Sequence, residues 1–199
     1  MKWLWMTISQ LLFSLFMYLM GSIFFGAALV PSLMLVLKVW NTTLTMALLP
    51  RLFFLGTTLA LSYFIFGFTL ILLVGFFRTG LGLKLREGNY PIFSKEALKW
   101  AFISSLYLMI NFTFIEFILL TPFANLLFRL LGAKLGKNVQ FNSKYVYDAT
   151  LLEIGDNTVV GGGAIIIGHI VERGSAETQE SQDRQECHDR FPLHHYAGL

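Results

Sequence analysis

Acidic side chains are missing from the first part of this sequence. Residues 1–77 contain no aspartate or glutamate, and their only charges are Lys2, Lys38 and Arg51. The whole chain is 14% charged and 55% hydrophobic, with 20 phenylalanines, whereas a soluble domain usually carries about 25% charged residues because water must wet its surface. The scarcity of charge argues against a soluble domain and excludes a disordered chain, and it predicts a surface that faces lipid over much of its area.

Cysteine is equally scarce. Cys187 is the only one, which excludes a disulfide-stapled secreted domain. It stands near His188, His194 and His195, but their spacing matches no zinc-binding pattern, so we predict no metal site. The net charge of +3 is small and no patch of interleaved basic and aromatic residues is present, so nucleic acid is not expected as a partner.

Two long runs without charge predict membrane-spanning helices. The runs cover 35 residues at 3–37 and 26 residues at 52–77, and about 20 apolar residues cross the hydrocarbon core as a helix. We therefore predict spans at about 5–37 and 52–77. The first run is too long for a perpendicular span, and Gly21 and Pro31 allow it to kink, tilt or run along the interface. A cleaved signal peptide is the less favoured alternative, because the run is about twice the usual length.

A third apolar run, at 100–120 within a predicted helix at about 96–120, contains Glu116 and Asn111. With two spans and both termini cytoplasmic, ten of the basic residues from Lys2 to Lys144 lie inside and only Lys38 and Arg51 lie outside, as the positive-inside rule favours. A third span would move five of those ten outside. We therefore predict an interfacial or re-entrant helix, with Glu116 at the wet boundary or inside the helix bundle, followed by a short helix at about 121–132. Residues 1–133 form the membrane region.

The residue pattern changes after residue 133. Aliphatic or aromatic residues recur every six positions, with one interval of seven, at Leu135, Phe141, Tyr147, Ile154, Val160 and Ile166. A second inward set is expected at Val139, Tyr145, Thr158, Ala164 and Ile170. Glycine follows the first set at Gly136, Gly155 and Gly161, and Asn138 and Asn157 occupy matching places.

This six-residue period predicts short strands joined by turns. Three such units close one coil, and the next coil stacks on it through parallel hydrogen bonds. Glycine and asparagine suit corners that need a positive φ. An ordinary sheet with period-two strands is the alternative, but it does not predict six matched positions. We predict a stub of about two coils over residues 134–173.

Two stretches carry a resemblance to a known family. Residues 131–139 (LGAKLGKNV) and 152–164 (LEIGDNTVVGGGA) resemble hexapeptide-repeat acyltransferases, and residues 121–127 (TPFANLL) with the apolar spans resemble the membrane-attached members, such as the terminal regions of some nonribosomal-peptide-synthetase-like proteins. The resemblance covers about residues 50–173. It implies a left-handed parallel β-helix, a homotrimer, and acyl transfer, often of acetyl from acetyl-CoA, to a hydroxyl or amine at clefts between subunits.

His169 is the candidate catalytic base, because it is the only histidine in the first 187 residues and the resemblance implies a position facing the cleft. Histidine suits this role because its side chain ordinarily titrates near neutral pH. The structural alternative is a corner histidine that only bonds the backbone. A base also needs an orienting partner, and Glu172 or Asp148 could supply one, although sequence separation establishes no contact.

The cosubstrate prediction concerns three lysines. If CoA is bound along the coil edges, Lys134, Lys137 and Lys144 are the candidates to meet its phosphates, and contact with lipid headgroups is the equal alternative. The run Gly161 to Gly163 lacks the lysine and the following helix of a phosphate-binding loop, so close packing of the coils explains it better.

The repeats stop at Gly174. A solvated, irregular tail over 174–199 is the simpler account. We favour the interpretation that the chain is a frameshifted or truncated gene product. With suitable codons, a reading frame displaced by one base from Gly174 can encode the peptide GPLKLKKVKIGRNVTIGFHCIIMPG. This peptide contains two further hexads. Sequencing the DNA across codons 170–199 tests this hypothesis, and codons that forbid the shifted peptide would contradict it.

Together these patterns predict an integral membrane acyltransferase, inactive if the repeat is truncated. The acceptor is expected to be a lipid-linked sugar or another amphiphile, because the anchor holds the site at the bilayer, and membrane lipid is the expected partner. The alternative is a non-catalytic membrane protein whose β-helix stub serves as an assembly or docking module. A transporter is disfavoured, because the two spans carry almost no polar groups to line a pathway.

Overall fold

The structure is a computed structural model that describes residues 2–85, 88–91, 94–172, 175–178 and 181–182. The chain forms two compact units. The helical unit comprises Met1–Leu83 and Lys99–Phe117, and the strand unit comprises Lys84–Leu98 and Ile118–Leu199. The described residues are mostly helical, and the strands are short.

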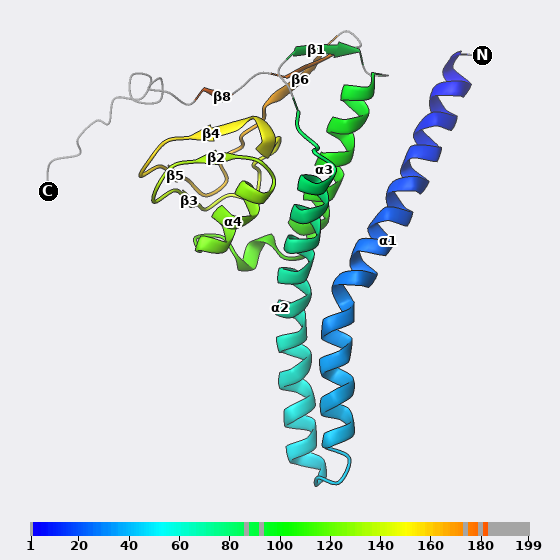
Figure 1. The fold of residues 1–199 in the computed structure, drawn as a ribbon, viewed down its shortest axis with the longest axis vertical. Coiled ribbons are helices and arrows are strands. Elements are labelled where there is room, and N and C mark those ends of the chain that lie inside the picture. The colour runs from blue at the N-terminus through cyan, green and yellow to red at the C-terminus, as the bar shows by residue number, and fades with distance from the viewer. Residues whose placement is uncertain (1, 86–87, 92–93, 173–174, 179–180, 183–199) are drawn as a thin grey trace, which may run out of the picture. The chain divides into compact units, whose positions relative to one another are not determined.

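Two long helices dominate the helical unit. Helix α1 covers Lys2–Thr42 and α2 covers Leu48–Gly80, and they lie side by side as a hairpin (Figure 1). Both are long and apolar enough to cross a membrane. Each extends beyond its predicted span, and Pro31 lies inside α1 without ending it.

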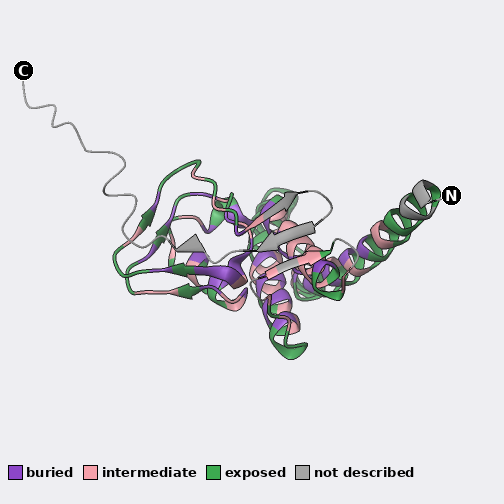
Figure 2. Cartoon of the chain, turned by 90° about the horizontal axis from the view of Figure 1, so that it is seen from above, coloured by how far each residue is buried: buried purple, intermediate pink, exposed green. Residues whose placement is uncertain are grey.

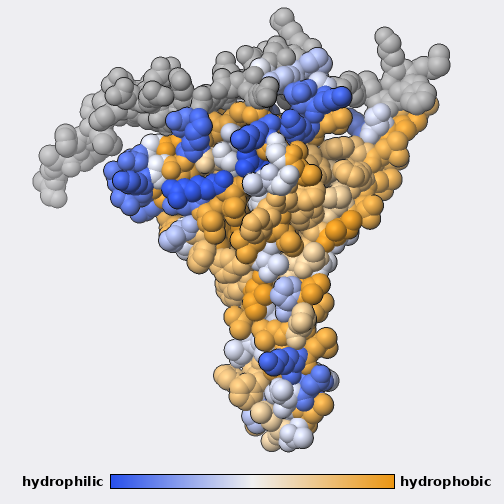
Figure 3. All heavy atoms as spheres, in the orientation of Figure 1, coloured by the Kyte–Doolittle hydropathy of each residue, from blue (hydrophilic) through white to orange (hydrophobic). Residues whose placement is uncertain are grey.

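The apolar side chains of these helices point mostly outward. Only 22% and 33% of the residues in their most apolar windows are buried, which distinguishes them from the core helices of a soluble protein. Exposed residues follow α1 along its length (Figure 2), and hydrophobic residues cover most of the helical face in Figure 3. Where the two helices meet, the rings of Phe24 and Phe77 lie 5.0 Å apart, and the buried Ser32 Oγ donates to the Ser62 carbonyl at 2.7 Å.

Helix α3 (Lys95–Thr113) packs antiparallel to the second half of α2. The rings of Phe102 and Phe77 lie 6.0 Å apart and those of Phe114 and Phe68 lie 5.2 Å apart. The Tyr63 hydroxyl donates to the Thr113 carbonyl. Helix α3 ends at Thr113, seven residues before the predicted boundary at 120.

A 3-10 turn, η1 (Ile115–Phe117), follows α3. The Phe114 ring lies directly over Gly67, where a Cβ atom would collide with it. Glu116 is exposed.

The strand unit contains two passes of the chain that pair in parallel, and we call residues 134–147 the first pass and residues 152–168 the second pass. Strand β2 (Lys134–Leu135) pairs with β4 (Leu152–Ile154), and β3 (Gln140–Phe141) pairs with β5 (Val159–Val160). Leu135 faces Ile154 and Phe141 faces Val160, as the six-residue period predicts.

The third pairing differs from the prediction by one residue. Ile166 bridges to Val146 in parallel, and not to Tyr147. Val146 is fully buried and Tyr145, predicted to point inward, is exposed. The reason lies in the preceding turn, where the buried Ser143 hydroxyl donates to the Ala164 carbonyl at 2.6 Å and accepts from the Tyr145 N–H at 3.2 Å, which shortens this corner of the first pass.

Two asparagines occupy equivalent corners of the two passes. Asn138 and Asn157 have φ values of 55° and 57°, and Asn138 Nδ2 donates to Asn157 Oδ1 at 3.0 Å. Their predicted equivalence and positive φ are confirmed. Asparagine tolerates this left-handed conformation better than other side chains do.

The glycines of the two passes differ in whether close contact or a positive φ explains them. Gly136 is the position of close approach, because its Cβ atom would stand 2.6 Å from the Asp156 backbone nitrogen. In the run from Gly161 to Gly163, a Cβ atom would meet the other pass only at Gly162, where it would stand 3.2 Å from Asn142 Nδ2, so close packing explains the middle glycine alone. Gly163 instead adopts a φ of 76°, which glycine reaches without a steric cost.

Helix α4 (Pro122–Leu130) covers the edge of the first pass that faces away from the second. Thr121 caps its N-terminus by accepting from the Phe123 N–H at 3.2 Å. Along the covered edge, the Leu120 N–H donates to the Phe141 carbonyl at 2.8 Å, and Asn125 Nδ2 donates to the Val139 carbonyl at 2.7 Å. The edge carbonyls are thus bonded instead of being left open to another chain.

The described end of the chain contains strands where an irregular tail is predicted. Strand β7 (Ser175–Thr178) pairs antiparallel with both β1 (Gly88–Pro91) and β6 (His169–Glu172), and β8 (Ser181–Gln182) pairs in parallel with β4. Residues 183–199, with Cys187 and the last three histidines, lie outside the described residues, as does the side chain of Ile170.

Candidate active site

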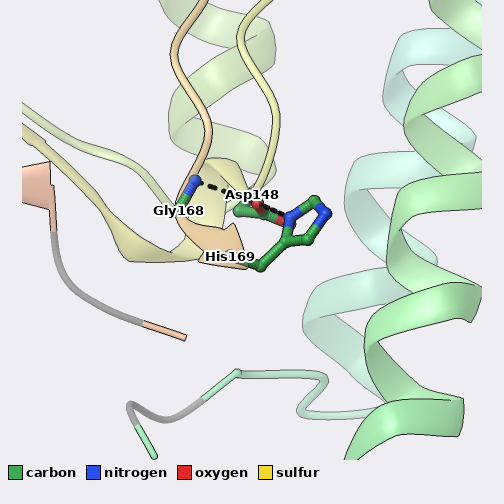
Figure 4. A network of polar contacts seen from close by, with 3 residues as sticks. All are labelled: Asp148, Gly168 and His169. Atoms are coloured by element: carbon green, nitrogen blue, oxygen red, sulfur yellow. Dashed lines mark hydrogen bonds and ion pairs between the residues drawn. The ribbon is translucent and has the colours of Figure 1, made fainter. Parts of the chain in front are cut away.

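His169 and Asp148 are brought together where the two passes end. Asp148 follows the first pass, and His169 follows the second and opens β6. Asp148 Oδ2 lies 2.5 Å from His169 Nδ1, and Figure 4 shows the carboxylate and the ring facing each other. Of the two orienting partners considered from the sequence, the contact is therefore with Asp148, whereas the side chain of Glu172 lies outside the described residues.

The backbone holds the Asp148 carboxylate in place. Asp148 adopts a left-handed conformation with φ 58° and ψ 44° at the start of the 3-10 turn η2 (Ala149–Leu151). Its Oδ2 atom also accepts the Gly168 N–H at 3.1 Å (Figure 4). The same oxygen therefore bonds the residue before the histidine and the histidine itself, which fixes the ring relative to the second pass.

The burial of the two side chains differs in a way that suits proton transfer. The Asp148 side chain is 0% exposed, whereas the His169 side chain is 23% exposed. A buried carboxylate that accepts from Nδ1–H selects the tautomer in which Nε2 is the proton acceptor, and it stabilises the imidazolium when the ring takes up a proton. This tautomer is assigned from the hydrogen bond.

The predicted cosubstrate lysines do not share one location. Lys134 Nζ lies 3.0 Å from Glu153 Oε2, and Lys137 donates its backbone N–H to Asp156 Oδ1 at 2.7 Å. Lys144 lies at the third side of the first pass, with its ammonium 5.6 Å from the ring centroid of Tyr145. The three lysines thus lie at different positions along the first pass, and their contact with CoA phosphates stays a prediction.

Sequence reasoning missed the Gly168 N–H and left the role of Asp148 open. One signal was available, because Asp148 ends the first pass where the six-residue interval lengthens to seven, and an aspartate at an irregular corner is a candidate for a positive φ. The pairing itself joins residues separated by 21 positions and depends on the stacking of the two passes.

Comparison with protein families, characterised proteins and solved structures finds no match to this chain.

Proposed function

We propose that this protein is a membrane-anchored acyltransferase of the hexapeptide-repeat type, which transfers an acyl group from an acyl-CoA, such as acetyl-CoA, to a hydroxyl or amine. One observation carries the proposal: the buried Asp148 carboxylate lies 2.5 Å from Nδ1 of the partly exposed His169. A histidine oriented by a carboxylate is the arrangement that activates a hydroxyl or amine acceptor.

The proposed fold of residues 134–173 is a stub of about two coils of a left-handed parallel β-helix. Its support is the recurrence of the parallel register. Partners are 19 residues apart at Leu135–Ile154 and Phe141–Val160, and 20 residues apart at Val146–Ile166. The two passes are thus paired at three places, which correspond to the three sides of a triangular coil. The resemblance to the family adds a homotrimer to the proposal.

In the proposed reaction, His169 Nε2 accepts the proton of the acceptor while the acceptor oxygen or nitrogen attacks the thioester carbonyl carbon. The new C–O or C–N bond forms, the C–S bond breaks, and the departing CoA thiolate takes the proton from the imidazolium. Asp148 balances the positive charge of the ring during this transfer. Acyl-CoA is proposed as the acyl donor because its thioester suits this reaction.

The membrane part of the proposal rests on the two long apolar helices. We place both termini and the strand unit on the cytoplasmic side, because that arrangement keeps ten of the twelve basic residues between Lys2 and Lys144 inside and two outside. An acceptor that reaches an anchored site from the bilayer is an amphiphile, and a lipid-linked sugar supplies the required hydroxyl.

The test is CoA release from acetyl-CoA by the full chain in nanodiscs that contain a polyprenyl-linked saccharide. His169→Ala is expected to lower kcat by about 10²–10⁴-fold, the usual contribution of a general base. His188→Ala is the matched control in the tail and is expected to leave the rate unchanged. An unchanged rate for His169→Ala would remove this residue from the mechanism.

Asp148→Asn separates orientation from folding, because asparagine also tolerates the left-handed conformation. It is expected to lower kcat with little change in KM, since the amide can leave the ring in the wrong tautomer. Asp156→Asn is the control, because Asp156 also accepts a backbone N–H, from Lys137. A folded wild-type chain that releases no CoA with any hydroxyl or amine acceptor would favour the non-catalytic docking module.

A further inference from the structure

The outer face of α4 carries exposed apolar side chains. Leu120, Phe123 and Leu126 are 57%, 46% and 42% exposed. On the opposite face of the same helix, Ala124, Leu127 and Phe128 are buried, and Phe128 packs on Phe141 of the first pass with ring centroids 4.3 Å apart. The helix is therefore apolar on both faces, and its outer face is partly exposed.

The charges of the strand unit separate between the two passes. Residues 118–147, which include α4 and the first pass, carry Arg129, Lys134, Lys137 and Lys144 and no acid. Residues 148–168, which include the second pass, carry Asp148, Glu153 and Asp156 and no lysine or arginine. The end of the strand unit that bears the exposed apolar face is thus also its basic end.

We infer that α4 docks this end of the strand unit onto an anionic bilayer surface. Leu120, Phe123 and Leu126 would enter the boundary between headgroups and acyl chains, as the apolar face of an interfacial helix does. Lys137 and Lys144 of the first pass would meet anionic headgroups, whereas Lys134 is paired with Glu153 of the second pass. Continuity along the chain favours lipid as the occupant, since this face begins three residues after Phe117, the last residue of the apolar helical unit.

The inference deepens the proposed function and rests on it for the nature of the acceptor. The second pass lies one strand spacing, about 4.8 Å, beyond the first, and α4 adds about 10 Å of helix diameter. His169, at the end of the second pass, then stands roughly 15 Å from the docked face. An acceptor must carry its reacting hydroxyl or amine that far above the acyl chains, which fits the glycan of a lipid-linked saccharide and not the glycerol of a phospholipid.

The test measures the depth of a nitroxide label on the full chain in nanodiscs, in a Cys187→Ser background. Leu126→Cys places the label on the docking face, and Val159→Cys is the control, because Val159 is an exposed apolar residue of the second pass. The label at 126 is expected to collide readily with oxygen and poorly with a water-soluble nickel chelate. The label at 159 is expected to show the reverse.

Two results would overturn the inference. Nickel accessibility at position 126 equal to that at 159 would place the face in water, and a label at 126 shielded from both reagents would place it against protein, such as a second copy of this chain. Nanodiscs of phosphatidylcholine alone are expected to give a shallower label at 126 than discs with phosphatidylglycerol. Equal depth in both would contradict the anionic surface.

The depth measurement needs no acetyl-CoA, so the two proposals fail separately. A deep label on a chain that releases no CoA would retain the docking surface and reject the acyltransferase. An active enzyme with a water-exposed label at position 126 would retain the acyltransferase and reject the docking surface.

Discussion

The two units of this protein place the same type of residue in opposite positions. In the helical unit, Phe53 of α2 is 71% exposed, whereas in the strand unit Phe141 of β3 is 1% exposed against Phe128. The helices contact one another through the buried Ser32–Ser62 hydrogen bond, through ring pairs such as Phe24 with Phe77, and through an aromatic cluster around Phe114. The passes of the strand unit are held by a packed apolar interior.

The difference follows from how each element satisfies its backbone. A helix bonds its own N–H and C=O groups, so its side chains can all face an apolar solvent without cost. A two-residue strand bonds nothing within itself and becomes ordered only when the next pass lies beside it. Substitutions that disturb packing should therefore lower stability strongly in the strand unit and only slightly on the outer surface of α1 and α2. Matched substitutions in the two units test this difference.

The largest expected effect comes from deleting a buried ring. Phe141→Ala removes the side chain that packs on Phe128 and should destabilise the strand unit by about 3–5 kcal/mol. Phe53→Ala is the matched control, and it should leave stability nearly unchanged in a bilayer. Hydrogen exchange of the amides in residues 134–168, measured on the full chain in nanodiscs, reports the loss of protection. Equal losses for the two variants would erase the distinction between the units.

The second test adds one methyl group to a glycine in each unit. Gly136→Ala should destabilise the strand unit by about 1–3 kcal/mol, because the new Cβ meets the Asp156 backbone and overpacking is costly. Gly26→Ala in α1 has open space around it and should be neutral or stabilise the helix by up to about 1 kcal/mol. Denaturant unfolding monitored in each unit checks the sign, and a stabilising Gly136→Ala would contradict the close approach of the passes.

The third test concerns the left-handed corner at Asn157, which has a φ of 57°. Asn157→Ala should cost about 1–2 kcal/mol, because alanine does not readily adopt this conformation. Asn157→Gly should recover much of that loss, although it removes the hydrogen bond with Asn138. The same unfolding measurement compares the two variants, and an alanine variant as stable as the glycine variant would show that the corner is relaxed in solution.

The smallest effect is expected where the two long helices meet. Ser32→Ala removes the hydroxyl that donates to the Ser62 carbonyl and should cost about 0.6 kcal/mol, the average for hydrogen bonds between helices in a membrane. Ser22→Ala is the control, because the Ser22 hydroxyl bonds the carbonyl of Tyr18 within α1. A loss of several kcal/mol for Ser32→Ala would show that the hairpin depends on this contact far more than its outward-facing side chains suggest.

Prediction from sequence succeeded for features with a local cause. The runs without charge located α1 and α2, and the recurrence of aliphatic residues located the pairings of Leu135 with Ile154 and Phe141 with Val160. It placed the third pairing one residue too far along, because the Ser143 hydroxyl bonds that tighten the corner involve the other pass. It also ended the regular structure at 174, whereas β7 forms by pairing with the distant β1.

The sequence by itself therefore determined that the chain has an apolar helical part and a six-residue repeat, because solvent preference and period act on each segment separately. The tertiary structure decided that α4 covers the free edge of the first pass, that Val146 and not Tyr145 points inward, and that Asp148 meets His169. These features depend on hydrogen bonds between residues 14 to 21 positions apart, and such bonds form only after separate segments have packed together.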